Sequence, residues 1–281
     1  MSWLSKFERE FLKKPGEHLL EIGITGSGKT QGLYWILDGL INRGKKETIV
    51  WFDTGKSSEI LTLAKFKPLK LLIPESLDVS IHINNVNDNI NDIEKENVID
   101  FKDVWRSLDE EKINVVCFEP FVLEPDIYTQ IVARLFKELI KLAHDYALPV
   151  PLSIFYDEFH KVAPARGHGL NEKHYRYGAI IQLNVERLRS LKVRFVATTQ
   201  AWTKIRKGVR SSFNWLFCRR GANFSNDETK LQRFNPLFDR LQTDEGIIVF
   251  PTRLFTDVLK LPGYGDGEEI GIVRYAGVFD L

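Results

Sequence analysis

Sulfur-containing residues are scarce in this chain of 281 residues, which holds two cysteines and one methionine. Cys117 and Cys218 are far apart in the sequence, and each lies within an apolar run. Two thiols are too few for a disulfide framework or a cysteine-rich metal site. We therefore expect both cysteines to be buried thiols in a reducing compartment.

The chain also lacks a long apolar stretch. Its N-terminus carries charges at Lys6, Glu8, Arg9 and Glu10, which excludes the apolar core of a signal peptide. No later run has the length that a membrane span requires. These absences predict a cytoplasmic protein without membrane insertion of its own, which would meet a membrane only through a partner.

Net charge is nearly absent as well, at +1, so the chain does not resemble a basic protein that coats nucleic acid. The charge is unevenly distributed, however. Residues 171–220 hold twelve Lys or Arg and two Glu, a net +10 that the rest of the chain offsets. This basic block is the segment in which we expect contacts to a polyanion.

Short apolar segments alternate with helical patterns along the sequence. Several segments lack polar alternation, which is typical of strands buried on both faces of a parallel sheet. The predicted strands span residues 18–22, 48–52, 113–118, 152–156, 193–198, 215–219 and 246–250. The clearest helical patterns span residues 29–42, 126–146 and 175–191. We therefore expect an α/β fold in a single domain over residues 1–281, with a mostly parallel central sheet and helices on both faces.

Residues 84–111 fit this pattern least. They hold nine acidic and three basic residues, and asparagine recurs among them. We interpret the segment as an acidic insertion on the surface of the domain rather than as a dedicated binding element.

The strongest motif matches the pattern GxxxxGK[ST] and lies directly between a predicted strand and a predicted helix. Glycines let such a loop turn tightly, so its backbone N–H groups point at the phosphates of a nucleotide. Lys29 would reach the β- and γ-phosphates, and the Thr30 hydroxyl would bind Mg²⁺. The motif predicts an ATP and Mg²⁺ site formed by Gly23, Ile24, Thr25, Gly26, Ser27, Gly28, Lys29 and Thr30.

Two adjacent acids, Asp157 and Glu158, follow the predicted strand at 152–156. Hydrolysis requires a carboxylate for the metal and a base for the attacking water, and both are expected at the end of a central strand. We assign Asp157 to the Mg²⁺ shell, through water, and Glu158 to the general base. The alternative is an acid pair that only stabilises the N-terminus of a helix.

Gln200 lies at the tip of the predicted strand that begins at residue 193. Its amide could donate to the γ-phosphate and accept from the lytic water. By itself, such a residue is usually an amide bonded to backbone. Together with the first two motifs, it indicates a catalytic residue that senses the γ-phosphate.

The order of these motifs, a P-loop, a strand ending in Asp-Glu and a strand ending in Gln, resembles the FtsK/HerA superfamily of DNA-pumping P-loop ATPases. The segment at 49–59, with Asp53, Gly55 and Glu59, looks like the second strand of that family. The resemblance covers roughly residues 19–250 and implies a RecA-like P-loop NTPase fold. It also implies an ATPase that translocates double-stranded DNA and assembles as a homo-oligomeric ring, usually a hexamer.

Members of this family complete each active site with an arginine from the neighbouring subunit, which offsets charge that develops on the γ-phosphate. By resemblance, Arg189 is the residue at the matching position, just before the strand that ends in Gln200. Arg187, Arg219 and Arg220 are further candidates. Any of these arginines could instead be a solvated residue or a DNA contact.

The segment after Gln200 carries four basic residues, Lys204, Arg206, Lys207 and Arg210. A translocase needs contacts to phosphates that ignore sequence, because each step must work on any DNA. We therefore expect this segment to grip DNA and to move when hydrolysis is sensed at Gln200. Trp202, in the same segment, is expected mainly to pack.

The P-loop begins at residue 23, without the long N-terminal domains of cellular relatives. In this respect the chain most resembles the genome-packaging ATPases of tailless double-stranded DNA viruses, including archaeal viruses. That resemblance implies capsid or portal-vertex proteins as partners and a place in the host cytoplasm or at the procapsid vertex. One alternative is an ATPase of conjugation, type IV secretion or plasmid DNA processing. Another is a virion-assembly ATPase similar to zonula occludens toxin, which predicts a transmembrane helix after the motor domain.

Overall fold

The main element of the computed structural model, which describes residues 3–84, 90–148, 151–265 and 267–279, is a ten-stranded sheet. Its strand order is β11-β10-β9-β1-β8-β7-β2-β6-β3-β5. The eight strands from β9 to β5 are parallel, whereas the pairs β9–β10 and β10–β11 are antiparallel. The predicted mostly parallel sheet is confirmed. Its strands are His18–Ile22 (β1), Thr48–Phe52 (β2), Leu69–Pro74 (β3), Ile93–Val98 (β5), Ile113–Val116 (β6), Leu152–Tyr156 (β7), Val193–Thr199 (β8), Trp215–Cys218 (β9), Glu245–Val249 (β10) and Leu259–Lys260 (β11).

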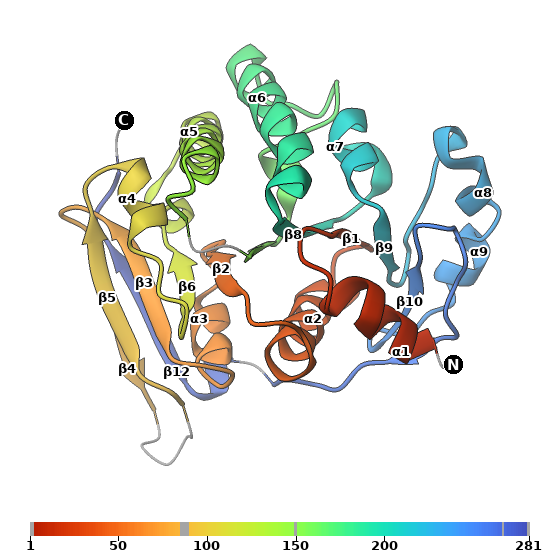
Figure 1. The fold of residues 1–281 in the computed structure, drawn as a ribbon, viewed down its shortest axis with the longest axis horizontal. Coiled ribbons are helices and arrows are strands. Elements are labelled where there is room, and N and C mark those ends of the chain that lie inside the picture. The colour runs from red at the N-terminus through yellow and green to blue at the C-terminus, as the bar shows by residue number, and fades with distance from the viewer. Residues whose placement is uncertain (1–2, 85–89, 149–150, 266, 280–281) are drawn as a thin grey trace.

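Helices cover both faces of this sheet (Figure 1). One face carries α4 (Phe101–Arg106), α5 (Pro125–His144), α6 (Glu172–Leu188) and α7 (Lys207–Ser212). The other face carries α1 (Trp3–Phe7), α2 (Lys29–Arg43) and α3 (Ser57–Leu63). A separate ribbon of β4 (Asp78–Ile83) and β12 (Gly271–Ala276) packs beside α3.

Short helical segments connect these elements. A π-helical turn η1 (Glu8–Leu12) follows α1. The remaining segments are η2 (Glu119–Phe121), η3 (Phe159–Lys161), η4 (Arg189–Leu191), η5 (Trp202–Lys204), η6 (Asn226–Glu228), α8 (Thr229–Gln232), α9 (Asn235–Phe238) and η7 (Gly267–Glu269).

Successive side chains of a central strand enter different layers of the core. In β2, Ile49 and Trp51 pack on the side of α2, whereas Val50 and Phe52 pack on the side of α5. All five residues of β2 are buried. Coverage on both faces is the physical reason why these strands lack polar alternation in the sequence.

Residues 84–111 differ from the acidic surface insertion that the composition predicted. β5 forms the edge of the main sheet and pairs in parallel with β3, and α4 buries Val104 and Trp105 completely. The Trp105 Nε1 donates to the Leu135 carbonyl at 2.8 Å, which ties α4 to α5. An edge strand tolerates charged side chains, and these obscured its pattern. Residues 85–89 of the predicted insertion lie outside the described residues.

Arg194, counted within the basic block, is completely buried in β8. Its guanidinium bonds the Glu47 carboxylate at 2.7 Å and the Phe11 carbonyl at 2.7 Å. It also lies over the Phe11 ring, 4.6 Å from the centroid. Arg194 therefore attaches the N-terminal segment to the sheet and adds nothing to a basic surface.

Two smaller expectations concern thiols and membranes. Cys117 and Cys218 are both buried and unbridged, as predicted. Within the described residues, no helix combines the length and the apolar character that crossing a bilayer requires.

Candidate nucleotide-binding and catalytic site

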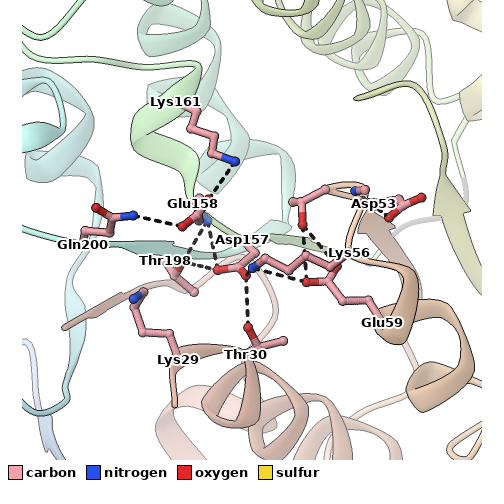
Figure 2. Close-up of polar contacts among 12 residues, drawn as sticks. Lys29, Thr30, Asp53, Lys56, Glu59, Asp157, Glu158, Lys161, Thr198 and Gln200 are labelled. Carbon is pink, nitrogen blue, oxygen red and sulfur yellow. Dashed lines mark hydrogen bonds and ion pairs between the residues drawn. The ribbon is translucent and has the colours of Figure 1, made fainter. Parts of the chain in front are cut away.

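The three predicted motifs follow three neighbouring strands. β8 lies between β1 and β7, with Ile22 paired to Thr199 and Tyr156 paired to Ala197. Because these strands are parallel, the residues that follow them meet at one edge of the sheet. The structure therefore brings together the P-loop, the Asp-Glu pair and Gln200, as Figure 2 shows.

The P-loop wraps around the N-terminus of α2. Gly26 and Gly28 have φ angles of 74° and 76°, in the left-handed region that favours glycine, and α2 begins at Lys29. The Lys29 ammonium donates to the Ile24 carbonyl of the same loop at 3.0 Å. Burial lowers the pKa of Lys29, although the nearby Asp157 opposes the shift. Loop N–H groups at the positive end of a fifteen-residue helix form a cradle suited to phosphate.

Thr30 and Asp157 form the candidate metal side of the site. The Thr30 hydroxyl donates to Asp157 Oδ2 at 3.1 Å, so the two side chains converge on one point. Asp157 is 1% exposed, and its Oδ1 accepts from Thr198 Oγ1 at 2.5 Å. A hydroxyl with one carboxylate fits Mg²⁺ when phosphate and water complete its shell. Across the described parts of the chain, no cluster of three or more His, Cys, Asp or Glu side chains could hold a metal.

Glu158 lies in a tight corner directly after β7. Its φ is 52°, and its backbone N–H donates to Thr198 Oγ1 at 2.9 Å. Its carboxylate is 2.7 Å from Lys161 Nζ and accepts from Gln200 Nε2 at 3.0 Å. Burial tends to raise the pKa of Glu158, but Lys161 and Gln200 outweigh burial and lower it to about 2. The carboxylate is therefore ionised at neutral pH.

Gln200 connects this carboxylate to the basic segment that follows β8. Its amide nitrogen donates to Glu158, and its amide oxygen accepts from Lys204 Nζ at 2.7 Å. A path of side-chain contacts thus runs from Glu158 through Gln200 to Lys204. Trp202 is buried against Phe224, with 5.3 Å between ring centroids, which confirms its packing role.

The site also contains three charged residues that the motifs did not indicate. Lys56, in the turn after β2, pairs with Asp157. Lys161 pairs with Glu158 and lies 3.6 Å from Glu119, whose pKa burial raises to about 7. The sequence could have predicted the ion pair between Glu158 and Lys161, because a single helical turn brings residues at this spacing of three together.

Asp53 and Glu59 lie where the family resemblance indicated acids after the second strand. Each is 1% exposed. Asp53 accepts from the Tyr275 hydroxyl at 2.7 Å and from the Gly55 N–H at 3.0 Å, whereas Glu59 accepts from Trp51 Nε1 at 3.3 Å. Burial raises the pKa of Asp53 to about 6 and that of Glu59 to about 8.

Arg219 supports its own P-loop, which removes it from the candidates for a residue that acts on a neighbouring subunit. It is completely buried at the end of β9. Its guanidinium donates to the carbonyls of Ser27 and Gly28, each at 3.2 Å, and to the Thr243 carbonyl at 2.6 Å. Its Nε lies 3.5 Å from the buried Glu21 carboxylate. These contacts make Arg219 a positioning residue for the phosphate cradle.

The other candidate arginines lie elsewhere. Arg189 precedes β8 at the edge of the sheet opposite the P-loop, 3.7 Å from Glu17. Arg187 is exposed on α6. Arg220 is half-buried beside the P-loop, and its carbonyl accepts from the Ile24 N–H at 3.1 Å.

A cavity of about 530 Å³ opens in front of the P-loop. The P-loop and α2 form one wall, Lys56 lies on a second, and the C-terminal segment 261–265 lies on a third. The Gln31 side chain on α2 accepts from the Tyr264 N–H at 2.8 Å and so holds that segment in place. The cavity is the space in front of the cradle in which a nucleotide would fit.

The fold is shared with viral packaging ATPases. B204, the DNA-packaging ATPase from Sulfolobus turreted icosahedral virus, matches with a TM-score of 0.54 and 12% identity, over 89% of this chain and 100% of B204. B204 of Sulfolobus turreted icosahedral virus 2, solved in complex with ATP-γS, matches with a TM-score of 0.52 and 10% identity, over 88% of this chain and 98% of that one. The same protein solved with AMPPCP gives a TM-score of 0.52.

At these identities the likeness shows the fold, and the roles of individual residues depend on the geometry described above. The P-loop NTPase fold that the motifs indicated, with its likeness to packaging ATPases, is confirmed at that level. No family model and no curated protein sequence matches this chain.

Replacing Arg219 tests its role in positioning the cradle. We expect Arg219→Met to weaken binding of a fluorescent ATP analogue about tenfold or more, since a hydrogen bond to a charged group contributes about 1.5–3 kcal/mol. The variant also leaves the Glu21 carboxyl without its cation, which lowers the melting temperature. Adding Glu21→Gln should restore part of the lost melting temperature without restoring affinity for the ATP analogue. Wild-type affinity in the single variant would contradict the assignment.

Asp53 predicts a pH dependence of stability. Its pKa is about 6 in the folded chain and 3.8 in the absence of burial. As pH rises through that window the unfolded chain loses the proton first, so the free energy of unfolding decreases, by about 1.4 kcal/mol per pKa unit of difference. We expect Asp53→Asn to make this decrease smaller in urea unfolding across the window, leaving only the part that Glu59 and Glu119 contribute. Asp239→Asn, at an exposed position after α9, is the matched control and should leave the decrease unchanged.

Proposed function

We propose that this chain is an ATPase that translocates double-stranded DNA and acts as the genome-packaging motor of a double-stranded DNA virus. The observation that carries the proposal is the contact path from Glu158 through Gln200 to Lys204. This path connects the candidate base to the basic segment. The fold shared with the B204 packaging ATPases supports the packaging role.

Each group of the site has one task in the proposed reaction. Bound Mg·ATP supplies the γ-phosphoryl group that water attacks. Lys29 and the loop N–H groups hold the β- and γ-phosphates, while Thr30 and Asp157 hold the metal. Glu158 accepts a proton from the attacking water, and Gln200 orients that water.

The contact between Lys161 and Glu158 sets a condition on catalysis. A carboxylate with a pKa of about 2 is a weak proton acceptor at neutral pH. Gln200 bonds Glu158 Oε1 while Lys161 pairs with Oε2, so a change at either partner alters the basicity of the carboxylate. A DNA phosphate that draws Lys204 away from Gln200 would change how the base is held. Hydrolysis and DNA contact are coupled in this way.

The basic segment is fixed to the site by backbone as well as by side chains. The Ala165 N–H donates to the Lys204 carbonyl at 2.8 Å, and the Arg206 N–H donates to the Ala163 carbonyl at 3.1 Å. The chain at 163–165 follows η3, which carries Lys161. A displacement of the segment therefore reaches both partners of Glu158.

Only part of the basic block can contact DNA. Arg210 pairs with Asp227 at 3.1 Å and lies over the Trp202 ring, and Arg206 stacks on the Tyr175 ring at 3.9 Å. The exposed members of the block are Lys173, Arg176, Arg187, Arg189, Lys192 and Lys207. Apart from Arg189, which is assigned below to the neighbouring subunit, the proposed DNA surface therefore runs from α6 to the start of α7.

We further propose a homo-oligomeric ring, a hexamer, in which Arg189 acts on the γ-phosphate of the neighbouring subunit. Arg189 is about half-exposed and lies at the sheet edge opposite its own P-loop, which supports a role outside its own site. Capsid or portal-vertex proteins are the proposed further partners.

Glu158 is tested by an isosteric exchange. We expect Glu158→Gln to retain binding of a fluorescent ATP analogue and to slow phosphate release about 10²- to 10⁴-fold, because a general base contributes about that much. Glu186→Gln, the same exchange at an exposed position of α6, should keep wild-type turnover. Wild-type turnover in the Glu158 variant would remove Glu158 from the role of base.

The DNA surface is tested on α6 and at the start of α7. We expect Lys173→Gln combined with Lys207→Gln, at two exposed members of the block, to reduce stimulation of ATPase activity by duplex DNA while basal turnover stays unchanged. The logarithm of the DNA-binding constant falls linearly with the logarithm of salt concentration, and each lost phosphate contact should make this slope shallower by about 1. Lys204 stays intact because it contacts the catalytic amide.

The matched control is Lys45→Gln combined with Lys46→Gln. These two exposed lysines precede β2 and lie at the opposite edge of the sheet. Their exchange should leave DNA binding and stimulation unchanged. If the double exchange at Lys173 and Lys207 leaves them unchanged too, this surface does not lie on the DNA path.

A further inference from the structure

A lysine with no role in the proposed reaction occupies the metal side of the site. Lys56 lies in the turn between β2 and α3, and its ammonium pairs with Asp157 Oδ2 (Figure 2). The same ammonium is 3.6 Å from Glu59 Oε1. The side chain of Lys56 is 42% exposed, whereas those of Asp157 and Glu59 are 1% and 2% exposed. One half-exposed cation thus lies within ion-pair distance of two buried carboxyl groups.

The oxygen that Lys56 contacts is the one assigned to the metal shell. Asp157 Oδ1 accepts from Thr198 Oγ1 and from the Glu158 N–H at 3.0 Å, so it faces the end of the strand. Asp157 Oδ2 faces Thr30, whose hydroxyl lies 3.1 Å away. The Lys56 ammonium therefore sits beside the point where Thr30 and Asp157 converge. A hydrated Mg²⁺ ion needs that same space.

We propose that Lys56 is the resident counter-cation of Asp157 in the metal-free protein, and that Mg²⁺-nucleotide displaces it toward Glu59. The inference rests on the proposed nucleotide site. Two cations within contact distance of one carboxylate oxygen repel each other, most strongly where water is scarce. The Glu59 carboxyl is the nearest alternative hydrogen-bond acceptor. Its present hydrogen bonds, from Trp51 at 3.3 Å and from Thr54 at 3.4 Å, are long, so it can accept the ammonium.

The proposed exchange gives Lys56 a function in both states. Before the metal binds, Lys56 balances the charge of a buried carboxylate that would otherwise be costly to hold. The same contact makes free Mg²⁺ a poor ligand, because the metal must first displace the ammonium. Lys56 therefore sets how much Mg²⁺ the protein requires, and it is a positioning residue rather than a catalytic one.

Removal of the ammonium should lower the Mg²⁺ requirement. The probe is an N-methylanthraniloyl derivative of ATP, and its binding is measured by fluorescence at increasing Mg²⁺. We expect the Mg²⁺ concentration that gives half-maximal binding to fall about tenfold in Lys56→Met, which corresponds to about 1.4 kcal/mol of lost competition. Lys46→Met, at an exposed lysine that pairs with Glu111, is the matched control and should behave as wild type. Lys56→Arg keeps the charge and should keep the wild-type requirement.

Thermal denaturation without nucleotide gives a second readout, and its response to Mg²⁺ is the part that a merely structural role would not change. We expect Lys56→Met to melt at a lower temperature than wild type in the absence of divalent ions. Mg²⁺ alone should then raise the melting temperature of this variant and leave that of wild type unchanged. An equal or higher Mg²⁺ requirement in Lys56→Met would overturn the inference while leaving the proposed function intact. Absence of Mg²⁺-dependent nucleotide binding in wild type would overturn both.

Discussion

The geometry of the site depends on one buried carboxylate, that of Asp157. It is 1% exposed, yet four groups converge on it: the hydroxyls of Thr198 and Thr30, the ammonium of Lys56 and the N–H of Glu158. Removing one partner from a buried charge typically costs about 3–5 kcal/mol. The three elements that supply the side-chain donors, β8, α2 and the turn after β2, must therefore keep their places for this charge to be tolerated. The same charge that is proposed to bind a metal also draws these elements together.

Asp157 and its neighbour Glu158 serve different parts of the molecule, although one peptide unit separates them. The carboxylate of Asp157 points toward Thr30 on the side of α2, whereas that of Glu158 points toward Lys161 and Gln200 (Figure 2). Successive residues of a strand face opposite sides, and the pair preserves this alternation at the strand end. In the proposed motor, the nucleotide is held on one side of this dipeptide and the DNA contact is reported on the other. A single tight corner, with Glu158 at a φ of 52°, therefore joins the two functions.

Local patterns in the sequence predicted the central strands, the P-loop and the Asp-Glu pair, because each depends on residues close together in the chain. β3 and β5 were both missed, and β5 shows no apolar run because it is an edge strand with charged side chains. The contact between Lys56 and Asp157 joins residues 101 positions apart, and no local pattern encodes it. The role of Arg219 was left open for a related reason. A basic residue at the end of a strand has the same sequence signature whether it faces a neighbouring subunit or, as here, the carbonyls of its own P-loop.

Burial also reduces the number of cations in the basic block that are accessible at the surface. Arg194 and Arg219 are completely buried, and each faces a buried carboxylate within the fold, that of Glu47 or that of Glu21. The exposed cations that could meet the proposed DNA are fewer than the composition suggests, and they are spread over α6 and the start of α7. Phosphate contacts contribute to DNA affinity roughly in proportion to their number, so a sparse set binds weakly and releases readily. A motor that steps along DNA must release it in every cycle, whereas a coat protein must not. The modest accessible charge therefore agrees better with repeated grip and release than the count of basic residues alone would indicate.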